Sequence, residues 1–391
     1  MKTFDAVVVG GSIAGLYAGM KLSEGGMSVC IIDRKKTDGV PVRCGEATGN
    51  LGELSRFFEP HKSWVAREIS GCALHINDSL CVKQAVRDAG VILHRDRLEQ
   101  GLAEEAGKLG ATILLDAIVT GLHESHHGEW DGVTVENRNF IAGRYIIGAD
   151  GCESKVGQWA GITRPLSLDE AASSIEYHVE SDYCNDGFLH FFMGSSVIVP
   201  GYIWVFPKGE KHVLAGGCLY GRPRETPKVK QFVDEFIKRR MPGARCHSMI
   251  TGCVPVTVCP RELTKRNVLI IGDAARQSNP LSAGGIMNAL EAADLAANAV
   301  LACNGDDRKL EVYSRQWARN QRRQQKIFRL LRDITVNSSD IEIAALARRT
   351  SRVFKGGIDR TRLFKLSVAQ LCILIMSVLP KAIRHCRALA G

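Results

Sequence analysis

A cluster of small residues near the start of the chain has a spacing that suits phosphate binding. Residues 10–15 read Gly-Gly-Ser-Ile-Ala-Gly and lie between an apolar, β-branched run and a helical pattern. Gly10 permits a tight turn, Gly15 lets the helix pack closely on the sheet, and the helix N-terminus attracts a pyrophosphate. Ser12 replaces the usual middle glycine but is small enough to keep the backbone accessible. Asp33 ends the next short strand, where a carboxylate can accept hydrogen bonds from ribose hydroxyls, so we predict a dinucleotide site.

Two further strand-and-turn motifs narrow this dinucleotide to FAD. Within residues 145–156, an apolar strand ends at Gly148, and Asp150-Gly151 then makes a sharp turn into a helix near Ser154. Within residues 267–275, a second strand ends in Gly272-Asp273. Asp273 can hold a ribitol hydroxyl, or it can serve only as a helix N-cap. A helix that begins at Gly285 and Ile286 would favour negative charge on a reduced flavin ring. No second glycine-rich nucleotide motif occurs, so we expect no separate NAD(P)H domain.

Three aromatic residues alternate along one short stretch of a chain in which only 6% of the residues are aromatic. Tyr202, Trp204 and Phe206 lie between Pro200 and Pro207. Because side chains alternate between the two faces of a strand, all three rings should project from one face. Such a face can pack into an ordinary core, or it can line a long apolar pocket.

These motifs, in this order, resemble the flavoprotein superfamily built like p-hydroxybenzoate hydroxylase. The Arg-Cys-Gly-Glu loop at residues 43–46, together with the aromatic strand that ends in Phe-Pro, is similar to the geranylgeranyl reductase family, in particular to archaeal digeranylgeranylglycerophospholipid reductases. The resemblance implies FAD as cofactor. In addition to Gly10, Ser12 and Gly15 of the glycine turn, it places flavin contacts on Ala14, Asp33, Cys44, Gly45, Ala47, Arg95, Val119, Asp273, Gly285 and Ile286.

The resemblance also implies the chemistry. The family saturates isolated trisubstituted alkenes of isoprenoid chains, which have no carbonyl to hold negative charge. Hydride transfer must therefore be coupled to protonation, with positive charge developing on the branched carbon. The site needs a dry apolar slot and a nearby acid, and aromatic faces stabilise positive charge. We expect Tyr202, Trp204 and Phe206 to bind the prenyl chain.

Two residues of the Arg-Cys-Gly-Glu loop are candidates for the acid. Cys44 would lie beside the flavin ring, where its thiol is protonated at neutral pH and could donate a proton. The alternative for Cys44 is a small buried side chain that only packs under the ring. Glu46 is the rival acid, and its alternative is a solvated loop carboxylate.

We therefore predict an enzyme that uses FAD to reduce C=C bonds in the geranylgeranyl chains of archaeal-type lipid precursors. The electron donor would be a small carrier such as an acidic ferredoxin, or NADPH. A flavin monooxygenase of the aromatic-hydroxylase type and a lipid-binding flavoprotein without turnover are the alternatives. We expect a cytoplasmic protein, because no secretory signal precedes the first strand, and peripheral contact with the inner membrane face would suit the lipid.

Composition limits the remaining classes of function. The 391 residues carry a formal charge of +9, and much of the basic excess falls between Arg308 and Arg332. This excess could be a solvated helix face, or it could meet an anionic membrane or an acidic protein. No nucleic-acid-binding module accompanies it, so we expect no nucleic acid. The 13 cysteines include no Cys-x-x-Cys pair, so we expect reduced thiols and no metal.

The expected fold is α/β (α+β), with a Rossmann-type FAD-binding domain, an inserted antiparallel-sheet substrate domain and C-terminal helices. We place the FAD-binding domain at residues 1–165 and 259–305, the substrate domain at 166–258 and the helical region at 306–391. Within the helical region, the uncharged segment from Leu366 to Leu379 is too short to span a bilayer. It would be a buried helix or a helix in the membrane interface.

Overall fold

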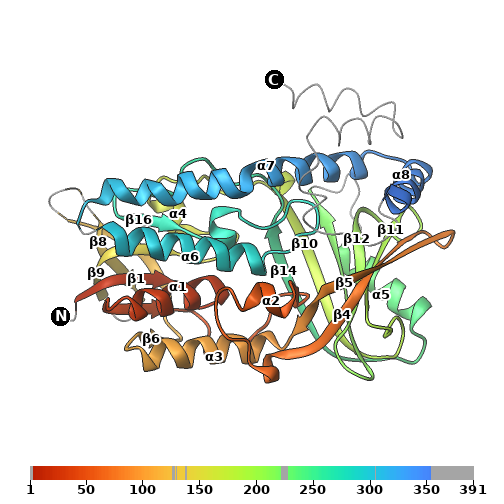
Figure 1. The fold of residues 1–391 in the computed structure, drawn as a ribbon, viewed down its shortest axis with the longest axis horizontal. Coiled ribbons are helices and arrows are strands. Elements are labelled where there is room, and N and C mark those ends of the chain that lie inside the picture. The colour runs from red at the N-terminus through yellow and green to blue at the C-terminus, as the bar shows by residue number, and fades with distance from the viewer. Residues whose placement is uncertain are drawn as a thin grey trace.

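The computed structural model describes residues 3–353 except 126–127, 129, 137–138, 222–227 and 304. The predicted helix from Leu366 to Leu379 lies outside the described residues. Within them, the chain forms two large sheets that lie side by side, with helices packed around the first (Figure 1).

The first sheet has a parallel centre, in the order β16-β9-β1-β2-β6, as the strand–helix–strand pattern predicts. An antiparallel hairpin of β7 and β8 extends it from β9, and β15 pairs antiparallel with β16. The strands are β1 (Thr3–Val9), β2 (Val29–Ile32), β6 (Thr112–Leu114), β7 (Val119–Glu124), β8 (Trp130–Val135), β9 (Asn139–Gly148), β15 (Thr264–Lys265) and β16 (Val268–Ile270).

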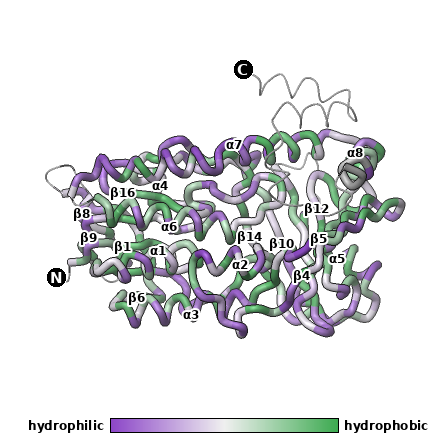
Figure 2. Tube along the Cα trace, in the orientation of Figure 1, coloured by the Kyte–Doolittle hydropathy of each residue, from purple (hydrophilic) through white to green (hydrophobic). Residues whose placement is uncertain are grey.

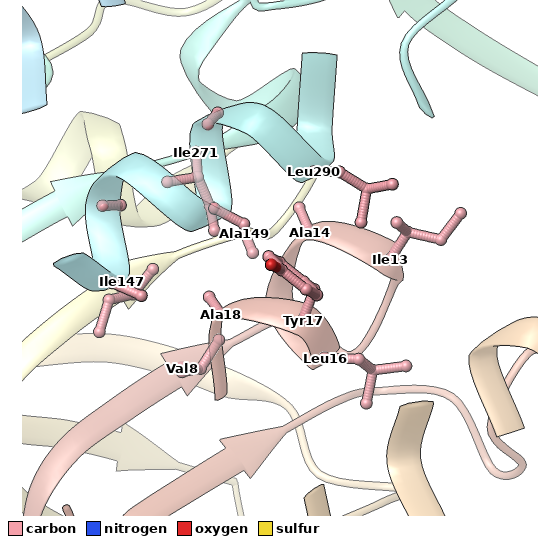
Figure 3. Packing of buried hydrophobic residues seen from close by; sticks show 14 of the residues in the cluster. Val8, Ile13, Ala14, Leu16, Tyr17, Ala18, Ile147, Ala149, Ile271 and Leu290 are labelled. Atoms are coloured by element: carbon pink, nitrogen blue, oxygen red, sulfur yellow. The ribbon is translucent and has the colours of Figure 1, made fainter. Parts of the chain in front are cut away.

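Alternate residues of these strands enter two separate cores. Val8 and Ile147 pack under helices α1 (Ile13–Glu24), α3 (Arg95–Lys108) and α6 (Ile286–Cys303), together with Leu290 of α6. Val7 and Ile146 face the other side, where α4 (Lys155–Trp159) and the β7–β8 hairpin cover them. Figure 3 shows the first core, where α6 lies against the start of α1. The parallel strands are thus buried on both faces.

The second sheet has the order β14-β10-β13-β12-β11-β4-β5-β3. Five of its strands come from the segment predicted for the substrate domain: β10 (Ala171–Glu180), β11 (Phe188–Gly194), β12 (Ile198–Pro207), β13 (His212–Tyr220) and β14 (Arg245–Pro255). Three come from earlier residues that the sequence prediction placed with the FAD-binding domain: β3 (Ala47–Thr48), β4 (Val65–Ile76) and β5 (Leu80–Leu93). The β4–β5 hairpin joins through a parallel pairing of β4 with β11, a long-range contact that local patterning does not reveal.

The two faces of this sheet pack differently. Ile203 and Val205 of β12 point toward helix α5 (Val229–Arg240) and form a core with Val233 and Phe236. Tyr202, Trp204 and Phe206 form a separate cluster on the opposite face. The period-two prediction for the aromatic strand is therefore confirmed.

Helix α7 (Glu311–Val336) lies across the top of both sheets in Figure 1 and leads to α8 (Asp340–Val353). Its first half buries Tyr313 and Trp317 in the first core, and Val336 packs near the aromatic cluster. Figure 2 shows a mainly hydrophilic start of α7 and more apolar residues toward its end. The helix therefore braces the two sheets against each other.

Among the described residues, α6 is the one helix long and apolar enough to cross a membrane. Half of that segment is buried inside the protein, against α1 and the first sheet. Its composition is therefore accounted for by a place in the core.

We expect Leu290→Ala to lower the free energy of unfolding by about 2–5 kcal/mol, because the residue is fully buried between α6 and α1 and its removal leaves a cavity. Urea denaturation would measure the loss. Ile341→Ala is the control, since Ile341 is 82% exposed and its truncation should change stability by less than about 0.5 kcal/mol. Equal effects of the two changes would contradict the packing described for α6.

Candidate active site

The glycine turn after β1 has no room for side chains at two positions. Gly10 has a φ of +112°, and a Cβ atom there would lie 2.2 Å from the carbonyl oxygen of Ala149. A Cβ atom at Gly15 would lie 1.8 Å from the carbonyl oxygen of Gly10. Helix α1 begins directly after Ser12, and Ala14 in its first turn is buried. The turn therefore brings its backbone and the start of α1 together, which is the arrangement that holds a pyrophosphate.

Asp33 lies beside this turn. Its carboxylate accepts hydrogen bonds from the backbone N–H groups of Gly11 (2.5 Å) and Lys35 (2.7 Å), and the residue is only 7% exposed. These bonds fix the carboxylate at the end of β2. An acceptor at this edge of a parallel sheet is suited to ribose hydroxyls.

Arg95, at the start of α3, connects the glycine turn with the Arg-Cys-Gly-Glu loop. Its guanidinium donates to the hydroxyl of Ser12 (2.6 Å) and to the carboxylate of Glu99 (2.8 Å), and its backbone N–H donates to Glu46 (3.1 Å). Ser12 in turn donates to Glu99 at 2.8 Å. Arg95 therefore reaches two of the predicted flavin motifs at once.

Glu99 is the residue of this group that the sequence prediction missed. It is 3% exposed and also accepts a hydrogen bond from the ammonium of Lys35 at 3.1 Å. Burial opposes its ionisation, but the charges of Arg95 and Lys35 outweigh that effect and lower the pKa of Glu99. An acidic residue four positions after Arg95 on a helix was the available signal.

The Arg-Cys-Gly-Glu loop folds over the same region. Glu46 is fully buried with a φ of +57°, and its carboxylate forms an ion pair with Lys208, just after β12. The prediction of a solvated loop carboxylate as its alternative is therefore wrong. Burial raises the pKa of Glu46, against the lowering effect of Lys208.

Cys44 is held at the other end of this loop. Its sulfur accepts a hydrogen bond from the N–H of Glu46 at 3.2 Å. Burial raises the pKa of its thiol, while the charge of Arg95 acts in the opposite direction. The thiol therefore stays protonated at neutral pH. Ala47 follows in β3, which pairs with Ile92 of β5 and ties the loop to the second sheet.

The third motif, around Asp273, is also near enough to Arg95 to be affected by its charge. Asp273 lies in a short 3-10 helix, Gly272–Ala275, and a Cβ atom at Gly285 would lie 3.6 Å from its carboxylate. Burial raises the pKa of Asp273 to about 6, and the charge of Arg95 lowers it in part. Helix α6 begins at Ile286, as the sequence predicts.

Val119 is placed differently from the other predicted contacts. It begins β7 and packs with the core on the opposite face of the first sheet. Val119 is connected to the site through Ala117, two residues earlier in the chain. The N–H of Ala117 donates to the carbonyl oxygen of Asp33 (3.0 Å). Its contact with a flavin stays a prediction.

The aromatic face of the second sheet lies directly against these loops. The hydroxyl of Tyr202 donates to the carbonyl oxygen of Ser282 at 2.6 Å, and that of Tyr220 donates to the carbonyl oxygen of Leu281. A Cβ atom at Gly45 would lie 3.2 Å from the ring of Phe206. The indole N–H of Trp204 donates to Glu176 at 2.7 Å, a second acidic residue that the sequence prediction missed. The only local signal for Glu176 was a polar residue in an apolar alternation.

The arrangement fits FAD on two counts. The glycine turn has the close backbone approaches of a phosphate cradle, and Asp33, Arg95 and Asp273 supply polar groups along a single region. Among the described residues, no group of three or more His, Cys, Asp or Glu side chains could hold a metal ion.

We expect Glu99→Gln to destabilise the protein by about 3–5 kcal/mol at pH 7, because it leaves Arg95 and Lys35 without their buried counter-charge. The pKa of Glu99 is lowered on folding, so its contribution is fully present above the unfolded value near 4.3 and is lost progressively as the pH falls through the lower folded-state pKa. Urea unfolding from pH 7 down to pH 3 should show the two proteins converging.

Glu105→Gln is the matched control on the same helix, because Glu105 is half exposed and pairs with the exposed Lys108. It should leave the unfolding midpoint nearly unchanged. A Glu99→Gln effect that persists unchanged at pH 3 would show that its carboxylate charge is not what stabilises the turn.

Sequence comparisons agree with this architecture. The lycopene cyclase protein family matches residues 5–388. A digeranylgeranylglycerophospholipid reductase of Methanosarcina acetivorans is 29% identical over 376 residues, which are 93% of this chain and 91% of that protein. The protein of the same name from Methanothrix thermoacetophila is 31% identical over 331 residues, 80% of this chain and 82% of that protein.

Solved structures share the fold. A geranylgeranyl bacteriochlorophyll reductase-like protein of Thermoplasma acidophilum superposes with a TM-score of 0.88 at 24% identity and covers 100% of both chains. A halogenase mutant crystallised with FAD gives a TM-score of 0.67 at 16% identity, covering 99% of this chain and 86% of that one. The predicted fold class and FAD are confirmed. The chain matches the lycopene cyclase protein family model over most of its length and belongs to the geranylgeranyl reductase family of FAD-dependent oxidoreductases.

Proposed function

We propose that this enzyme reduces isolated C=C bonds in the geranylgeranyl chains of archaeal-type membrane lipid precursors. The observation that carries the proposal is the contact between the aromatic face and the flavin loops. Tyr202 is hydrogen-bonded to the turn that precedes α6, and Phe206 lies over Gly45. An apolar, aromatic surface at this place suits a long prenyl chain, and the names of the related reductases support the same substrate class.

The proposed roles follow from position. The first sheet and its helices would hold the FAD, and the second sheet would hold the prenyl chain. FAD, when bound and reduced, supplies a hydride. Tyr202, Trp204 and Phe206 would exclude water and stabilise positive charge on the branched carbon of the alkene. Cys44 would lie beside the flavin ring and shape the site. The proposed flavin contacts are those named above, from Gly10 to Ile286.

Two other functions are possible on the same fold. Halogenases share this fold. A monooxygenase of the aromatic-hydroxylase type would need a small polar substrate beside the flavin. The tyrosine hydroxyls of the aromatic face are already bonded to backbone carbonyls, which leaves mainly ring surface to a ligand. This favours an apolar substrate over a phenol. A lipid-binding flavoprotein without turnover would have the same surface, so an experiment must distinguish it from a reductase.

Reducing the bound flavin with dithionite under nitrogen, then adding a geranylgeranyl phospholipid, would test the proposal. We expect the flavin to be reoxidised and the lipid to gain two hydrogens for each double bond, as read by absorbance and mass spectrometry. A lipid with saturated chains is the control. Flavin that stays reduced would support a lipid-binding role, and a hydroxylated product formed only with oxygen would support a monooxygenase.

An acidic electron carrier is the donor that the surface suits best. Arg315, Arg319, Arg323 and Lys326 are exposed on α7 at intervals of one helical turn, so they form a basic stripe. A basic stripe attracts an acidic protein such as a ferredoxin and speeds its encounter. The same stripe could also meet anionic lipid at the inner membrane face.

We expect the double change Arg315→Glu with Arg319→Glu to slow flavin reduction by a reduced ferredoxin on the order of 10-fold at low salt, because it reverses the charge that steers the carrier. Stopped-flow absorbance would measure the rate. Reduction by dithionite should not change. Arg87→Glu is the control, since Arg87 is 96% exposed on the β4–β5 hairpin. Equal rates for the variant and the control would argue against docking on α7.

A further inference from the structure

Glu176 occupies an unusual position in the middle of the second sheet. It lies on β10, opposite Gly216 of β13, and Gly216 is in turn opposite Trp204 of β12. Its neighbours Ile175 and Tyr177 point into the core beneath α5. Glu176 therefore points to the face that carries the aromatic residues.

Gly216 makes the contact between Glu176 and Trp204 possible. A Cβ atom at Gly216 would lie 2.3 Å from the indole ring, so only glycine leaves room for the ring to cross β13. The indole N–H then reaches one carboxyl oxygen of Glu176, Oε2, at 2.7 Å. The same oxygen would lie 3.4 Å from a Cβ atom at Gly45, so the carboxyl is next to the proposed flavin loop.

The second carboxyl oxygen of Glu176 has no hydrogen-bond partner among the described residues. Oε1 is fully buried and makes no hydrogen bond within the described part of the chain, and the residue is 3% exposed. A buried polar atom without a partner costs about 1–3 kcal/mol, so such atoms are uncommon unless they serve a function. Because Oε2 already accepts from the indole, a proton on the carboxyl would sit on Oε1.

Burial keeps Glu176 uncharged at neutral pH, and the charged groups around it do not reverse that effect. Burial raises the pKa of Glu176 to about 8, with a further rise from Glu46, while the Trp204 N–H and Lys208 lower it. Glu46 and Lys208 neutralise each other as an ion pair. His178, two residues along β10 on the same face, has a lowered pKa through burial and Lys208. Gly216 of β13 and Ile250 of β14, the residues opposite Glu176, carry no charge.

We propose that Glu176 is the proton donor of this enzyme, an inference that rests on the proposed alkene reduction. The O–H bond at Oε1 would break and its proton would bond to the less substituted carbon through the π electron pair. The branched carbon would become cationic and accept the hydride that reduced flavin supplies. The alkene gains two hydrogens, the flavin is oxidised, and the carboxylate left on Glu176 regains a proton from solvent.

The two acids of the neighbouring loop are less suited to this step. Both oxygens of Glu46 are occupied, one by the N–H of Arg95 and the other by Lys208. The sulfur of Cys44 accepts a hydrogen bond from Glu46, and its thiol pKa is raised. A thiol of raised pKa is a weaker acid than a neutral carboxyl. Cys44 is therefore assigned to shaping the site.

The test compares Glu176→Gln with the unaltered enzyme in the dithionite-reduced single-turnover assay. We expect the amide, which keeps the size but cannot donate the proton, to slow alkene reduction about 10²- to 10⁴-fold. FAD binding, measured by flavin fluorescence, should stay the same. Glu180→Gln is the matched control, because it makes the same change four residues along β10 at a partly exposed site beside His247. Cys44→Ser should keep the wild-type pH profile.

The pH profile separates proton donation from a structural role. The acid form of Glu176 is required, so the wild-type rate should be constant below pH 8 and fall as the pH rises through it. Trp204→Phe removes a hydrogen bond that lowers this pKa, so it should move the alkaline limb to higher pH. Glu176→Gln should lose that limb altogether.

A measurement without flavin supplies a second readout. In the FAD-free protein, infrared difference spectra should show a protonated carboxyl band that titrates near pH 8 and is absent in Glu176→Gln. Absence of the band from the wild type, or a Glu176→Gln enzyme with the wild-type rate and alkaline limb, would overturn the assignment. A wild-type enzyme that reduces no alkene would instead overturn the proposed function, while the infrared result would still report the state of Glu176.

Discussion

The buried charge of Arg95 is the constraint on which the proposed flavin site depends. A guanidinium removed from water must be compensated, and the carboxylate of Glu99 and the hydroxyl of Ser12 do this at hydrogen-bonding distance. The hydrogen bonds of Arg95 and Glu99 to Ser12 join α3 to the glycine turn, so the packing of the helix and the geometry of the turn cannot vary independently. The backbone N–H of Arg95 also holds Glu46. Burial raises the pKa values of Cys44 and Asp273, and the positive charge of Arg95 opposes that rise. Arg95 thus interacts, by hydrogen bonds or by its charge, with the glycine turn, the Arg-Cys-Gly-Glu loop and the segment that carries Asp273.

The second sheet is attached to this arrangement by hydrogen bonds of its aromatic side chains. Tyr202 and Tyr220 bury their rings in the apolar cluster and donate their hydroxyls to backbone carbonyls of the turn that precedes α6. An unpaired carbonyl in this position would be costly, so the tyrosines fix the sheet relative to the turn. The Glu46–Lys208 ion pair makes a second connection at the end of β12. The aromatic face therefore packs in the core and also lies against the proposed site, so the two interpretations of the strand are compatible.

Local motifs predicted the parts of the site whose chemistry is encoded within a few residues. Gly10 and Gly15 are required by backbone contacts that no side chain could tolerate, and Asp33 follows its strand directly. The alternation of Tyr202, Trp204 and Phe206 likewise sufficed to place them on one face. The sheet membership of β4 and β5 could not be predicted, because it depends on a parallel pairing with β11. Glu176 was hidden for a related reason: its role depends on the strand order β10-β13-β12 and on a glycine in the middle strand.

Two buried carboxyl groups near one site illustrate how environment separates their roles. Glu46 and Glu176 are almost equally inaccessible to water, yet the first has a lysine and a backbone donor on its oxygens, while the second has one indole N–H. A cationic partner stabilises the ionised form, so Glu46 is suited to holding the loop against β12. A neutral donor compensates burial only in part, so Glu176 keeps its proton near neutral pH. Burial raises the pKa of both groups, but the lysine bound to Glu46 opposes that rise directly, so the two carboxyl groups are suited to different roles. Gly216 sets the environment of Glu176, because it admits the indole whose N–H is the donor to Glu176 within the described part of the chain.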